Sequence, residues 1–140
     1  MSQAAQQTEQ AQQQAQAQLE AIRELMEAME RASSGEDVTF DGEEMDWDDL
    51  QERGREWPLS VLVRSAWQTP GDPLQSSEFE VLLCTGGPAV RIRGDLSQHN
   101  EPEIVRLEYQ DWFTSWHRLT MSSEEQEALL GFARLFWFGE

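Results

Sequence analysis

The chain of 140 residues carries 27 acidic residues against 10 arginines and no lysine, which gives a formal net charge of −17. The missing lysine excludes Schiff-base chemistry on lysine and the lysine of a phosphate-binding loop. Direct binding to nucleic acid needs clustered positive charge, and this composition argues against it.

The sequence also bears on the compartment. No apolar run is long enough to span a membrane, and residues 1–18 lack both the basic and the apolar part of a signal peptide. Cys84 is the only cysteine, so no internal disulfide can form, which is typical of a reducing compartment. We therefore expect a cytoplasmic protein with no membrane contact.

Residues 1–34 form a Gln/Ala-rich arm for which we predict one long helix. Both residue types favour helix, and no Gly or Pro interrupts the arm before Gly35. The spacing predicts a helix over about residues 8–32, frayed in its Gln/Ala half. One helical stripe of apolar residues runs through Leu19, Ile22, Leu25, Met26 and Met29. This stripe either docks on the protein's own core or makes a homodimer or partner contact.

Residues 35–57 form an acidic segment. A short strand is expected at residues 38–40. A variant capping box of Asp41 and Glu44 then predicts a short helix, with Trp47 among its apolar anchors. No basic residue separates the nine carboxylates of this segment, which are Glu36, Asp37, Asp41, Glu43, Glu44, Asp46, Asp48, Asp49 and Glu52.

Residues 58–140 carry the predicted core. Alternation of apolar and polar residues indicates strands at residues 59–64, 79–84, 89–94 and 104–110. Ser122 and Glu125 form a capping box that opens a C-terminal helix. The fold class is therefore α+β: an antiparallel sheet of about four strands with the C-terminal helix packed on it, preceded by the long Gln/Ala-rich helix.

Catalytic, cofactor and metal roles find little support in the residue pattern. Asp46, Asp48 and Asp49 do not follow the order of an EF-hand calcium loop. Cys84 cannot be tied by sequence to a histidine or a carboxylate that would activate it. Four aromatic residues lie within residues 109–116, where they line a ligand pocket or cap the end of the sheet. We assign no catalytic, cofactor-binding or metal-binding residue and expect no enzyme.

The density of negative charge is the strongest functional signal. Carboxylates three or four positions apart on a helix lie about 5–6 Å from one another. Phosphates advance about 3.4 Å per nucleotide along a DNA strand, so a folded acidic segment presents charge on a similar scale. The alternative is a solvated acidic linker that only aids solubility. Trp47 among the acids favours a folded interface with an apolar anchor.

Four stretches, at residues 58–67, 83–92, 107–112 and 136–140, resemble a family of small acidic proteins of phages and mobile elements. The resemblance covers about residues 36–140 and leaves the Gln/Ala-rich arm outside. It implies a setting in which small acidic proteins act on host defence or host DNA-handling machinery, some by imitating DNA. It assigns no activity to particular residues.

These observations lead to one functional hypothesis and two alternatives. The first is a non-enzymatic inhibitor, phage-encoded and located in the host cytoplasm, that covers a basic, nucleic-acid-binding groove of a CRISPR, restriction or similar complex with the nine carboxylates and Trp47. The second is a structural or assembly adaptor that uses the apolar stripe of the arm. The third is a small-ligand-binding or hydrolytic protein that uses its aromatic cluster and His117.

Overall fold

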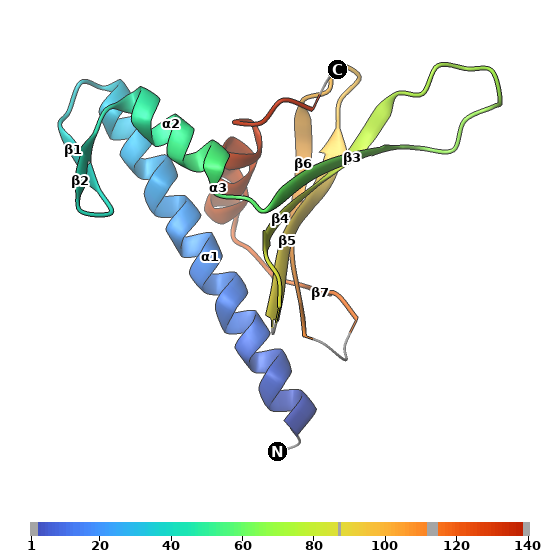
Figure 1. Cartoon of the computed structure of the whole chain (residues 1–140), viewed down its shortest axis with the longest axis horizontal. Coiled ribbons are helices and arrows are strands. Elements are labelled where there is room, and N and C mark those ends of the chain that lie inside the picture. Colours follow the sequence, from blue (N-terminus) through green and yellow to red (C-terminus); the bar gives the residue numbers. More distant parts are fainter. Residues whose placement is uncertain (1–2, 87, 112–114, 139–140) are drawn as a thin grey trace.

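The computed structural model describes residues 3–86, 88–111 and 115–138, and its fold is α+β (Figure 1). The elements in chain order are α1 (Gln3–Ser33), β1 (Val38–Phe40), β2 (Glu43–Met45), α2 (Trp47–Glu56), β3 (Ser60–Ser65), β4 (Ser76–Cys84), β5 (Pro88–Leu96), β6 (Pro102–Asp111), β7 (His117–Arg118) and α3 (Ser123–Ala133).

The main sheet has five antiparallel strands in the order β3-β4-β5-β6-β7, so each strand pairs with its neighbour in sequence. The expectation of about four strands is therefore one strand short. The missed strand is β7, in which His117 pairs with Tyr109 and Arg118 pairs with Glu108. A strand of two residues is too short to show the alternation by which strands are recognised.

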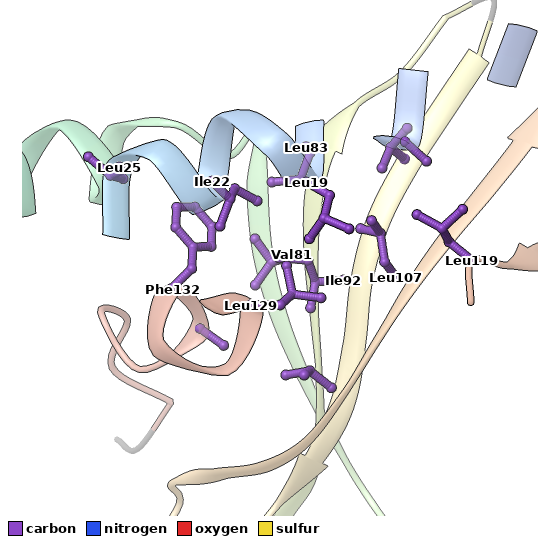
Figure 2. Close-up of a cluster of buried hydrophobic side chains, with 14 of the residues drawn as sticks. Leu19, Ile22, Leu25, Val81, Leu83, Ile92, Leu107, Leu119, Leu129 and Phe132 are labelled. Carbon is purple, nitrogen blue, oxygen red and sulfur yellow. The ribbon is translucent and has the colours of Figure 1, made fainter. Parts of the chain in front are cut away.

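Helices α1 and α3 cover one face of this sheet, and α1 crosses it as the longest element of the molecule (Figure 1). Figure 2 shows Leu19 and Ile22 of α1 directed at side chains of the sheet and of α3, whereas Leu25 lies beside α2. The core beneath α1 is formed on the sheet by Val81, Leu83, Ile92 and Leu107, and on α3 by Leu129 and Phe132.

The apolar stripe of α1 is part of this core. Leu19, Ile22, Leu25 and Met29 are buried, and Met26 is partly buried against them. Of the two alternatives for the stripe, docking on the protein's own core is confirmed. A homodimer or adaptor contact through Leu19, Ile22, Leu25, Met26 and Met29 finds no support, because four of these five side chains are buried in the protein's own core.

The Gln/Ala half of α1 is helical from Gln3, so the expected start near residue 8 is corrected. Ala11 and Ala15 are fully buried although neither is large. Two alanines one helical turn apart let the helix backbone pack closely on the core, and such small side chains do not stand out in a pattern of large apolar residues.

The acidic segment is folded into a hairpin and a helix. β1 pairs with β2 through the turn at Asp41 and Gly42, both of which have a positive φ. The capping box expected at Asp41 and Glu44 is wrong, because these residues belong to the turn and to β2. The helix begins one turn later, where Asp46 and Asp49 form the capping box of α2.

The capping box of the C-terminal helix is confirmed, with the Ser122 hydroxyl accepting from the backbone of Glu125. Within the described ranges, no helix combines the length and the apolar character needed to cross a bilayer.

Candidate partner-binding face

A groove of about 510 Å³ runs between α1 and α3. Because the apolar stripe of α1 points into the core, the glutamates of the helix are left on its solvent side. The floor of the groove contains Met26, Met29 and Ala128. Its carboxylates are Glu20, Glu24, Glu27 and Glu30 from α1 and Glu124 and Glu127 from α3.

A second hollow of about 420 Å³ lies beside the β1–β2 hairpin. It has apolar walls from Val38 and Met45. The carboxylates around it are Glu36, Asp37, Glu44, Asp46 and Asp49. We call the eleven carboxylates of the two hollows, together with Trp47, the acidic face.

Trp47 joins the two hollows, because its side chain lines both of them. It is the first residue of α2 and 40% exposed, so a large aromatic surface is available at the centre of the acidic face. An apolar anchor ringed by charged groups is the usual arrangement of a protein–protein interface.

The structure gathers part of the residue set expected from the sequence. All nine predicted carboxylates are exposed, and five of them line the hairpin hollow with Trp47. Asp41, Glu43, Asp48 and Glu52 lie outside both hollows. Asp41 accepts a hydrogen bond from Arg53 Nη2 at 3.0 Å, which ties the hairpin turn to α2.

Two carboxylates of the acidic face serve the fold. Asp46 Oδ1 accepts from the Asp49 backbone N–H at 2.8 Å, and Asp49 Oδ2 accepts from the Asp46 N–H at 3.2 Å. This reciprocal cap fixes the start of α2 and therefore the position of Trp47. The segment is thus a defined structure rather than a solvated linker.

The molecule's own arginines neutralise little of the acidic face. Arg23 lies 3.3 Å from Glu20, and Arg31 lies 3.5 Å from Glu36. Both pairs are exposed, and such pairs contribute about 0–1 kcal/mol in water. In the described part of the chain, the other nine carboxylates of the acidic face form no ion pair.

Five of the ten arginines lie on the opposite side of the molecule, on the sheet face that α1 and α3 leave uncovered. The register places Arg64, Arg91, Arg93, Arg106 and Arg118 there among Glu78, Glu80, Asp95 and Glu108. Arg106 lies opposite Arg93 and reaches Asp95 at 3.4 Å. Five cations and four carboxylates nearly balance on this open face. The large negative charge therefore lies elsewhere, and much of it is on the acidic face.

The open face is held by ion pairs. Arg91 Nε donates to Glu108 at 2.8 Å, and its guanidinium lies 3.8 Å from the ring centroid of Trp116. Arg64 donates to Glu78, and this hydrogen bond lowers the pKa of the Glu78 carboxyl. These arginines are engaged within the chain and do not reach the acidic face.

The cysteine and the histidine of the predicted aromatic region lie in surroundings typical of structural residues. Burial raises the pKa of the Cys84 thiol, which keeps it protonated and weakly nucleophilic. His117 stacks on Tyr109 at 5.5 Å between ring centroids. Part of the predicted aromatic cluster, residues 112–114, lies outside the described residues. Among the described side chains, no three from His, Cys, Asp and Glu are placed to hold a metal ion.

The glutamates of α1 and α3 are the functional candidates that the sequence did not single out. Their signal was present, since Glu20, Glu24, Glu27 and Glu30 lie mostly off the apolar stripe. What the sequence could not supply is that α3 packs beside α1 and completes the groove. Comparison with protein-family models, with curated proteins and with solved structures gives no match to this chain.

Proposed function

We propose that the protein is a non-enzymatic inhibitor whose acidic face binds a basic, nucleic-acid-binding surface of another protein and keeps nucleic acid off that surface. The observation that supports this proposal is the folded array of eleven carboxylates around Trp47, drawn from α1, α3 and the hairpin segment.

The spacing of charge suits such a partner. Along α1, Glu20, Glu24 and Glu27 follow one another at three or four positions, which places neighbours about 5–6 Å apart. A basic groove built for phosphates meets negative charge at comparable intervals on this helix. Binding would release the anions held in that groove, so association would be fast and weakened by salt.

The array also carries a cost that the fold does not require. Packed like charges repel one another and lower the stability of the folded state. Nine of the carboxylates on the acidic face have no cation beside them among the described residues. A surface that binds a basic partner through its negative charge must keep these carboxylates in spite of their repulsion.

The proposed setting comes from the resemblance to small acidic proteins of phages and mobile elements. In that setting the protein would act in the cytoplasm of a host cell, on a CRISPR, restriction or other DNA-handling complex. The carboxylates would stand in for DNA phosphates, and Trp47 would supply the apolar contact.

A charge-reversal experiment tests the proposal. One variant replaces Glu24, Glu27, Asp37 and Glu44 by Arg; all four are exposed, unpaired and outside the capping boxes. A matched control replaces four exposed acids outside the acidic face, Glu9, Asp72, Glu101 and Glu103, by Arg. Each variant moves the formal net charge from −17 to −9.

The readout is capture of proteins from a bacterial lysate, followed by displacement of DNA from each captured protein. At about 50 mM salt we expect the wild type and the control to capture the same nucleic-acid-binding proteins, and at about 500 mM salt to lose them. The acidic-face variant should capture none. Equal capture by both variants, or captured proteins that keep their DNA, would contradict the proposal.

A further inference from the structure

The outer edge of β3 carries a run of exposed apolar side chains. β3 is the first strand of the sheet and pairs only with β4 within the described residues. An unpaired edge offers a row of backbone N–H and C=O groups to any further strand, and proteins usually protect such edges with charge, proline or a covering element.

The side chains of β3 lack that protection. Val61, Leu62 and Val63 are 38%, 58% and 45% exposed. Val61 and Val63 pair with the buried Val81 and Phe79, so they lie on the helix-covered face of the sheet, beyond the reach of the helices. Leu62 pairs with Glu80 and lies on the open face. The strand is therefore apolar and exposed on both faces at once.

The charge around this edge differs from that of the rest of the molecule. No carboxylate occurs from residue 57 to residue 71, in a chain whose net charge is −17. Arg64 is the only charged residue of β3, and it is paired with Glu78. Two copies of the protein could meet along this strand without placing acids of β3 opposite each other.

We infer that β3 pairs antiparallel with β3 of a second copy, with Leu62 of both copies at the two-fold axis, and joins the two sheets into one. In this register Val61 lies opposite Val63 of the second copy. Ser60 lies opposite Arg64, so no like charges are paired. An isologous contact of this kind uses the same patch on both copies and closes after two. A second copy fits because the pattern of the strand is complementary to itself.

The loop after β3 would enlarge the contact. Trp67 is fully exposed, and continuing this register places it opposite residue 57 of the second copy and near the exposed Leu59. A tryptophan that becomes buried removes about 150–250 Å² from water. Two such residues, added to the paired strands and Leu59, bring the contact toward the roughly 1,000 Å² that a specific interface needs.

Sedimentation velocity of the full chain from about 1 µM to about 500 µM tests the inference. We expect the wild type to shift from a 16.1 kDa monomer to a species of twice that mass. Leu62→Arg places two like charges at the axis and should raise the dissociation constant at least about tenfold. Ile104→Arg is the matched control, because Ile104 is 49% exposed on the same open face but on β6.

A crosslinking experiment tests the register. In a Cys84→Ser background, Leu62→Cys should form a disulfide-linked dimer on mild oxidation, because directly opposite Cβ atoms lie about 4.5–5.5 Å apart. Val61→Cys should not crosslink to itself efficiently but should crosslink to Val63→Cys when the two are mixed. Ile104→Cys should form no disulfide-linked dimer, because Ile104 lies on β6 and away from the paired edges.

Several outcomes would overturn the inference. One is a wild type that stays monomeric throughout the concentration range, and another is a Leu62→Arg dimer as tight as that of the wild type. A monomer that instead captures a strand of another protein on β3 would also reject the second copy as occupant. Salt separates this contact from the proposed partner binding: screening of two chains of charge −17 should strengthen self-association and weaken binding to a basic partner.

Discussion

Gly94 shows how closely the central strands approach one another. A Cβ added at this position would lie 1.9 Å from the backbone oxygen of Ile104 and 2.7 Å from the ring of Phe79. The backbone of β6 cannot retreat without disrupting its pairing with β5. We expect Gly94→Ala to lower the free energy of unfolding by about 3 kcal/mol, measured by urea denaturation.

Gly131 in α3 provides the contrast for this prediction. A Cβ there would meet only the terminal methyl of Met26, at 2.8 Å, and that side chain can move. Alanine is also a better helix former than glycine by about 1 kcal/mol. Gly131→Ala should therefore leave stability unchanged or raise it. Similar losses in the two variants would show that the contact at Gly94 is not the cause.

The Ser122–Glu125 capping box makes a prediction about pH. The backbone N–H of Ser122 donates to Glu125 Oε1 at 2.9 Å, and this bond lowers the pKa of the Glu125 carboxyl. A lowered folded-state pKa stabilises the fold above the ordinary value of 4.5, and this stabilisation is lost as pH falls through the folded-state pKa. The stability difference between wild type and Glu125→Gln should therefore shrink on acidification. Ser122→Ala should lower stability by about 1 kcal/mol at neutral pH.

At the scale of elements, α1 is the part of the molecule on which the core depends. The side chain of Ile22 in α1 is fully buried in the core, so Ile22→Ala should lower the free energy of unfolding by about 2–5 kcal/mol. Gln16→Ala on the exposed side of the same helix should change it by less than about 0.5 kcal/mol. A chain that lacks residues 1–34 should not fold. A folded, cooperative unfolding transition without α1 would contradict this account of the core.

Some elements of the fold follow from local sequence patterns, and others depend on tertiary packing. The stripe of α1 and the alternation in β4, β5 and β6 follow from local spacing, so these elements could be predicted. The hairpin that opens the acidic segment could be predicted only in part. Asp41 and Asp46 each precede an acid by three residues, and only the pairing of β1 with β2 shows that Asp46, not Asp41, caps the helix. The groove between α1 and α3 depends on tertiary packing and has no local signal.

At the scale of the whole molecule, the arrangement of charge has a consequence for stability. Half of the arginines lie on the open face of the sheet, and only Glu20 and Glu36 of the acidic face have an ion pair among the described residues. The other carboxylates of that face therefore repel one another without a paired cation. The distance over which exposed charges interact falls from about 30 Å at 0.01 M salt to about 10 Å at 0.1 M salt. Added salt should therefore relieve the repulsion within the acidic face and raise the melting temperature.

We expect the melting temperature to rise by several degrees between about 0.01 M and about 0.15 M NaCl, which corresponds to about 1 kcal/mol or more for a chain of this length. Glu24→Gln with Glu27→Gln removes two neighbouring charges from the groove and should raise the low-salt melting temperature while it reduces the salt effect. The same pair of changes at Glu101 and Glu103 should do less, because those acids lie outside the acidic face. If both pairs of substitutions change the melting temperature equally, total charge rather than its crowding on the acidic face governs stability. The repulsion would then no longer mark that face as a surface used for binding.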